Sequence, residues 1–146
     1  MSSRRHFLKL AGSTTVLGVL QLRCGSSTSG AAPASGPVSA GNVSSVPVGH
    51  LDFVDNEPII LGRDAGGLYA MTSICTHQDC NMSGSGGIDA SGIFCSCHGS
   101  RFTRTGAVAQ GPAQSALIHY KVDLAADGTI TVQANSIVDA SARTSV

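Results

Sequence analysis

The sequence has no tryptophan, only 4% aromatic residues and only 12% charged residues. A core with so few aromatic rings must be built mainly from Val, Ile, Leu and Ala, and the 18 glycines predict frequent turns between short strands. Positive charge is scarce after residue 35, where five basic residues accompany nine acidic ones, a net charge of −4. A mildly acidic domain lacks the electrostatic surface that binds nucleic acid, and that class of partner is excluded.

The N-terminal apolar run is too short to cross a bilayer comfortably. It covers residues 10–22, whereas a membrane-spanning helix needs ~20 apolar residues. The charged stretch before it, Ser3-Arg4-Arg5-His6-Phe7-Leu8-Lys9, resembles a twin-arginine export motif. We therefore predict that residues 1–24 are an export signal or membrane anchor and that the protein works at the periplasmic side of the cytoplasmic membrane, anchored or soluble. Cys24 is a candidate lipidation site, although Arg23 departs from the usual pattern.

The rest of the chain divides by composition. Residues 25–45 are mostly Ser, Gly, Ala and Pro, which bury too little apolar surface to offset the entropy of ordering, and this predicts a flexible linker. From residue 46, short apolar runs alternate with turns, and residues 118–124 alternate apolar and polar positions. This period of two predicts an all-β fold, a small antiparallel barrel or sandwich over residues 46–133. Residues 134–146 read as a polar tail, and His119 is expected to face solvent.

Two short motifs carry the chemistry-bearing residues: Cys75-Thr-His77-Gln-Asp-Cys80 and Cys95-Ser-Cys97-His98-Gly-Ser100. Each offers a thiolate and an imidazole at close spacing. The 17 residues at positions 78–94 are enough for a hairpin that brings the two motifs together. Two Cys and two His suit either a tetrahedral zinc ion or a binuclear iron–sulfur cluster.

The motifs resemble those of the Rieske iron–sulfur proteins, in particular the branch found in cytochrome bc and bf complexes, which carries C-T-H-x-x-C and C-x-C-H-G-S. The resemblance covers roughly residues 46–133 and implies one [2Fe–2S] cluster held in a two-loop subdomain. By this resemblance Cys75 and Cys95 bind one iron, His77 and His98 bind the other, and Cys80 and Cys97 form a disulfide. A zinc-stabilised binding domain without redox chemistry is the alternative of a different class.

Further residues are assigned by the same resemblance. Gly111 and Pro112 lie in a segment similar to the family's Gly-Pro-Ala-Pro loop, which covers a third side of the cluster. The Ser100 hydroxyl is placed to donate to a bridging sulfide. Phe102 stands where high-potential members have a tyrosine that donates to a cysteine sulfur. One donor fewer predicts a lower reduction potential than in those relatives.

The resemblance implies electron transfer as the iron–sulfur component of a quinol–cytochrome c reductase-like complex. The chain then accepts an electron at its histidine-ligated iron and passes it to a cytochrome, with cytochrome b or cytochrome c-like proteins as partners and quinol as a candidate substrate. Relatives that oxidise quinol carry an apolar residue after the first ligand histidine, whereas this chain has Gln78 followed by Asp79. A polar tip favours a protein partner.

The alternative is the small Rieske subunit of a periplasmic oxidase of the arsenite-oxidase type, with a large molybdenum subunit as partner. No residue is assigned a catalytic role.

Overall fold

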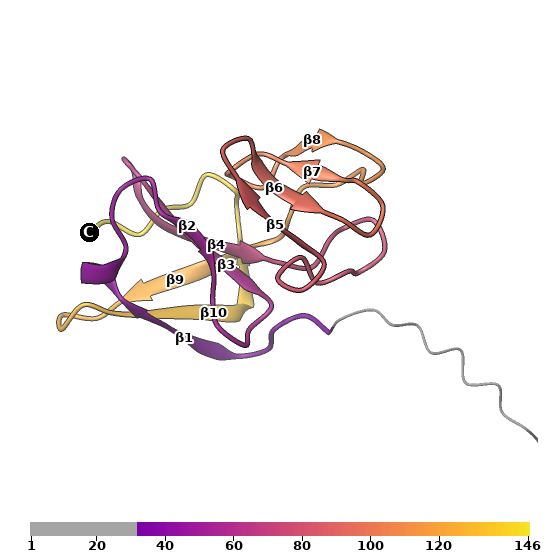
Figure 1. The fold of residues 1–146 in the computed structure, drawn as a ribbon. Coiled ribbons are helices and arrows are strands. Elements are labelled where there is room, and N and C mark those ends of the chain that lie inside the picture. The colour runs from indigo at the N-terminus through magenta and orange to yellow at the C-terminus, as the bar shows by residue number, and fades with distance from the viewer. Residues whose placement is uncertain (1–31) are drawn as a thin grey trace, which may run out of the picture.

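The computed structural model describes residues 32–146, so the predicted signal or anchor and Cys24 lie outside the described residues. Its strands are β1 Pro37–Asn42, β2 Leu51–Phe53, β3 Ile59–Asp64, β4 Gly67–Thr72, β5 Gly86–Asp89, β6 Gly92–Cys95, β7 Arg101–Phe102, β8 Val108–Gln110, β9 His119–Leu124 and β10 Thr129–Val138. They form a six-stranded sheet in the order β1-β10-β9-β4-β3-β2 and a four-stranded sheet in the order β5-β6-β7-β8 (Figure 1). All named strand pairs are antiparallel, which confirms the predicted all-β fold.

Strands β3 and β4 separate two hydrophobic cores. Side chains alternate between the faces of a strand, so Ile59 and Leu61 of β3 enter a core with β9 and β10, while Ile60 between them enters a second core. Strand β4 divides in the same way, with Leu68 and Ala70 facing the first core. Because both faces are covered, these strands read in the sequence as continuous apolar runs. No helix of residues 32–146 is long and apolar enough to cross a membrane.

The prediction that His119 faces solvent is wrong. His119 is 3% exposed and the neighbouring Ile118 is 44% exposed. The start of β9 is covered on both faces, since Tyr120 enters the first core while His119 lies next to Leu117 and pairs with Met71 of β4. The alternation over residues 118–124 correctly predicts the strand β9, but the pattern does not reveal that both faces at the start of this strand are buried.

The domain is longer at its N-terminal end than the predicted 46–133, and the predicted linker of residues 25–45 ends earlier. Strand β1 pairs with β10 in the register Pro37↔Gln133 and Val38↔Val132. Val38 is 7% exposed and belongs to the first core. Composition misjudged this segment because it does not show that a sheet partner satisfies the backbone, or that Val38 and the partly buried Ala40 pack against the first core.

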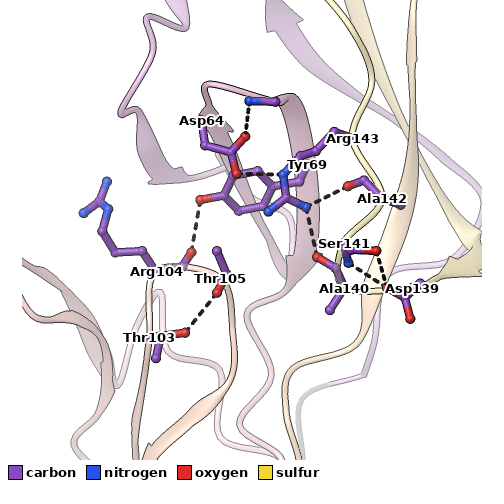
Figure 2. Close-up of polar contacts among 11 residues, drawn as sticks. Asp64, Tyr69, Thr103, Arg104, Thr105, Asp139, Ala140, Ser141, Ala142 and Arg143 are labelled. Atoms are coloured by element: carbon purple, nitrogen blue, oxygen red, sulfur yellow. Dashed lines mark hydrogen bonds and ion pairs between the residues drawn. The ribbon is translucent and has the colours of Figure 1, made fainter.

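The predicted polar tail at 134–146 is also part of the folded domain. Strand β10 continues to Val138, and beyond it Thr144 and Leu68 exchange two backbone hydrogen bonds, both 2.9 Å. Figure 2 shows Arg143 at the centre of this contact: its guanidinium lies 4.3 Å from the centre of the Tyr69 ring, and its Nε donates to Asp64 at 2.7 Å. The C-terminal segment is therefore fastened to the β3–β4 hairpin.

Charge and burial shift two pKa values in this contact. Burial alone raises the pKa of Asp64, but hydrogen bonds from Arg143 and the Gly66 amide outweigh it and hold this pKa below its ordinary value. Burial, with the Asp64 charge nearby, raises the pKa of Tyr69. The Tyr69 hydroxyl stays protonated and donates to the Arg104 carbonyl oxygen at 3.1 Å, which links β4 to the turn between β7 and β8.

The four-stranded sheet carries the candidate site. The predicted hairpin before Cys95 is confirmed, with β5 and β6 paired in the register Ile88↔Ile93. Ile93 and Phe102 are fully buried, and they share the second core with Cys75 and Cys95. This core joins the two sheets and places the two cysteine motifs at its edge.

Candidate metal centre

The first motif forms a loop that leaves the end of β4 and closes on itself. The Cys75 amide N–H donates to the Cys80 carbonyl oxygen at 2.8 Å, and the Asp79 N–H donates to the Cys75 carbonyl oxygen at 3.0 Å. Asp79 takes a positive φ of 53° to make this turn. Cys75 is 1% exposed at the base of the loop, and His77 is half-buried.

The second motif repeats this hydrogen-bond pattern in the loop between β6 and β7. The Cys95 N–H donates to the Ser100 carbonyl oxygen at 2.9 Å, and the Gly99 N–H donates to the Cys95 carbonyl oxygen at 3.0 Å. Gly99 takes a φ of 84°, at the position that Asp79 occupies in the first loop. Each loop thus buries its first cysteine and turns outward beyond it, where His98 is exposed.

The structure brings the two loops together as the sequence predicts. A disulfide joins Cys80 to Cys97. The rings of His77 and His98 meet edge to face with their centres 4.8 Å apart. The Sγ atom of Cys95 lies within 4.8 Å of both disulfide sulfurs, but those two sulfurs are consumed by the disulfide and are not available as ligands.

The donors that remain fit a binuclear iron–sulfur cluster. Cys75 and Cys95 are both buried free thiols, and burial, followed by the neighbouring Cys75, raises the pKa of Cys95. To serve as thiolate ligands, two buried sulfurs side by side need a cation that compensates their charge. The Nδ1 atom of His77 is buried without a hydrogen-bond partner among the described residues, an arrangement that a bound metal resolves. Two sulfur and two nitrogen donors are the set that a Rieske centre uses.

A third loop, around Gly111 and Pro112, is tied to both cysteine loops. Thr76, between the first cysteine and histidine, donates its hydroxyl to the Ser115 carbonyl oxygen at 2.6 Å. From the second loop, the Ser100 Oγ accepts the Ala113 N–H at 3.0 Å. Ser100 is fully buried and its hydroxyl hydrogen stays available to a further acceptor, as its predicted role requires. Reasoning from sequence missed Thr76, whose only signal was a hydroxyl between two predicted ligands.

Comparison with known proteins identifies the family. A family model described as the Rieske [2Fe-2S] domain matches residues 36–126. The chain belongs to the Rieske [2Fe–2S] family. The Rieske domain holds one [2Fe–2S] cluster, and its match begins ahead of residue 46, in agreement with the pairing of β1 with β10. This family is an electron-transfer family, and the match argues against the zinc-stabilised alternative.

Similar curated proteins are iron–sulfur subunits. The chain is 34% identical over 116 residues to the cytochrome b6-f complex iron-sulfur subunit of Synechococcus sp. (strain CC9605), a match that covers 75% of this chain and 64% of that subunit. It is 33% identical over 97 residues to the subunit of the same name from Chlorobaculum tepidum, covering 65% of this chain and 52% of the relative. The matched part of this Rieske chain therefore spans about half to two thirds of the length of these relatives.

A solved structure with the same fold is a chain in the complex of reduced oxygenase and oxidized ferredoxin in carbazole 1,9a-dioxygenase. It aligns with a TM-score of 0.52 and 24% sequence identity, covering 73% of this chain and 100% of that chain. This likeness shows that the Rieske chain shares its overall fold with an experimentally determined structure.

Proposed function

We propose that this chain is the iron–sulfur component of a membrane-bound cytochrome complex, with Cys75, Cys95, His77 and His98 holding its cluster. When bound, the [2Fe–2S] cluster supplies one-electron redox chemistry. The observation that carries the proposal is the convergence of two buried thiols with two adjoining imidazoles across the Cys80–Cys97 disulfide. The names of the curated relatives support a cytochrome complex as the setting.

The cysteine side of the site is buried, and its histidine side reaches solvent. Cys75 and Cys95, each 1% exposed, lie against Phe102 and Met82 in the second core, which excludes water from the thiolates. His98 lies at the exposed surface. A short path for the electron therefore leads through the imidazole edge, and a partner that docks there approaches the centre without displacing the core.

The surface around this edge favours a protein as the partner. Gln78 and Asp79 follow His77 and are both exposed, so amide and carboxylate groups occupy the tip of the first loop. Placing an exposed carboxylate in an apolar quinone pocket costs desolvation energy. We infer that the electron passes to a cytochrome and that quinol is a poor direct substrate. In this proposal the twin-arginine segment exports the folded protein to the periplasmic side of the membrane, and residues 1–24 or a lipidated Cys24 hold it there.

The test begins with a redox titration of the purified full chain followed by electron paramagnetic resonance (EPR). The reduced chain is then mixed by stopped flow with a soluble c-type cytochrome, and the oxidised chain with a short-chain quinol. We expect a Rieske-type EPR signal, rapid reduction of the cytochrome, and slow quinol oxidation that a Gln78→Leu variant accelerates. Absence of the EPR signal overturns the ligand assignment. Quinol oxidation as fast as cytochrome reduction, unchanged in Gln78→Leu, overturns the choice of partner.

A further inference from the structure

One side chain outside the proposed ligand set lies where both cysteine loops are joined. Asn81 follows Cys80 directly, and its side-chain oxygen Oδ1 accepts three hydrogen bonds. The Ser73 hydroxyl donates at 2.8 Å, the Ser83 hydroxyl at 2.9 Å and the Ser83 backbone N–H at 3.1 Å. Because a backbone N–H can only donate, the amide atom that receives it must be the oxygen, and the orientation of the Asn81 amide is settled by its partners.

The hydrogen bond from Ser73 to Asn81 joins the two chain segments at the base of the first loop. Ser73 is fully buried on the segment that leads into Cys75. Asn81 lies on the segment that leaves Cys80, and the two segments form an isolated bridge between Ile74 and Asn81. The Asn81 side chain therefore holds the entry of this loop to its exit.

The bonds to Ser83 connect the same residue to the second loop. They fold residues 81–85 into a turn in which the Ser85 N–H donates to the Asn81 carbonyl oxygen at 2.9 Å. The Ser85 carbonyl oxygen then accepts the N–H of Ser96, between Cys95 and Cys97, at 2.8 Å. One residue thus touches the base of the first loop and, through a single turn, the backbone of the second.

We propose that Asn81 is a positioning residue that sets the relative placement of the two cysteine loops, and with it the geometry of the metal centre and the protection of the Cys80–Cys97 disulfide. An oxygen acceptor is required at this position, since an apolar side chain of the same size leaves the buried Ser73 hydroxyl without its partner. Aspartate retains the oxygen and adds a negative charge close to the centre. The inference uses the ligand set proposed above, but its disulfide readout does not depend on it.

The test compares Asn81→Leu, Asn81→Asp and Ser83→Ala with the exposed control variants Asn135→Leu and Asn135→Asp on β10. Each purified full-length holoprotein is examined by EPR line shape after reduction, by midpoint potential, and by the rate at which dithiothreitol opens the disulfide. We expect Asn81→Leu to broaden the EPR signal and to open its disulfide roughly tenfold faster than Asn135→Leu, the factor expected when local opening loses about one hydrogen bond. Ser83→Ala shows a smaller change in the same direction.

Asn81→Asp separates positioning from charge. We expect it to keep the wild-type line shape and disulfide rate while its midpoint potential falls further than that of Asn135→Asp. Wild-type line shape and disulfide rate in Asn81→Leu overturn the proposal. If Asn81→Leu does not fold, an Asn81→Asp variant with altered line shape or a Ser83→Ala variant with wild-type disulfide kinetics overturns it instead. A wild-type chain without a Rieske EPR signal contradicts the ligand set, and the disulfide rates still decide the role of Asn81.

Discussion

Asp79 and Gly99 occupy equivalent positions in the two cysteine loops. Each donates its backbone N–H to the carbonyl oxygen of the cysteine four residues before it, at 3.0 Å in both loops, and each has a positive φ, 53° for Asp79 and 84° for Gly99. The two loops are therefore built on one backbone plan, although the first places its histidine two residues after the cysteine and the second three residues after it.

This equivalence predicts how position 79 tolerates substitution. Asp79→Val forces a β-branched side chain into the left-handed region and is expected to lower the free energy of unfolding by about 1–2 kcal/mol. Asp79→Gly, which gives the first loop the residue of the second, is expected to leave stability within about 1 kcal/mol of wild type. Urea unfolding measures both. Equal losses in the two variants contradict the shared backbone plan.

Thr76→Val removes the hydrogen bond to Ser115 and keeps the shape of the side chain. We expect the third loop to loosen, with faster hydrogen exchange at the amides of residues 113–116 and about 1 kcal/mol lower stability. Thr131→Val, a strand position on β10, is the control for the loss of a hydroxyl. Unchanged exchange in the third loop of Thr76→Val shows that other contacts hold it.

Phe102→Tyr places a hydroxyl in the second core, where Phe102 is fully buried beside Cys75 and Cys95. A donor close to a cysteine sulfur stabilises the more negative, reduced state, so the midpoint potential is expected to rise. The control is Phe94→Tyr on β6, where the ring is half-buried beneath Arg101. A midpoint in Phe102→Tyr that is unchanged or lowered contradicts the donor account.

His119 makes stability depend on pH. Burial lowers its pKa, so the unfolded chain binds a proton below about pH 6.5 that the folded chain does not. The free energy of unfolding therefore falls as the pH drops below about 6.5 toward the lowered folded-state pKa, and it is fully retained above about pH 6.5. In His119→Phe this fall is expected to shrink. Unfolding curves from about pH 7.5 to 5 measure the slope, and an identical slope in both proteins excludes His119 as its source.

Arg143→Met breaks the contact that fastens the C-terminal segment. The loss of its ion pair with Asp64 and of its stacking on Tyr69 is expected to cost about 1 kcal/mol, after allowance for solvent at the carboxylate. The lowered pKa of Asp64 adds stability above about its unfolded value of 3.8, which wild type loses on acidification through the folded-state pKa. Arg143→Met, which lacks this ion pair, is expected to lose less stability on the same acidification. Arg101→Met is the comparison, because it breaks the more exposed ion pair with Asp89. It is expected to lower the free energy of unfolding by less than Arg143→Met does.

The sequence allowed prediction of what local spacing controls. Period-two patterning indicated strands, the 17 residues at positions 78–94 allowed the hairpin before Cys95, and the resemblance of the two motifs supplied the Cys80–Cys97 disulfide seen in the structure. These features depend on residues close together in the chain or on donor chemistry that few motifs share.

What escaped prediction depends on contacts between distant residues. Composition could not show that Pro37–Asn42 finds a partner almost a hundred positions later, or that Arg143 crosses to Asp64. His119 was misplaced because the turn between β7 and β8 packs, at Gly106, on a face that alternation alone leaves to solvent. Thr76 and Asn81 act through backbone carbonyls and serine hydroxyls, which leave no pattern in the sequence.

The strand order has a consequence for when the domain can fold. Strand β1 is hydrogen-bonded within its sheet to β10, and β9 joins β10 from the other side. During synthesis β1 therefore stays without its partner in the sheet until β10 has left the ribosome. The six-stranded sheet is thus completed only after translation of residues 129–138, which follow both cysteine loops in the chain.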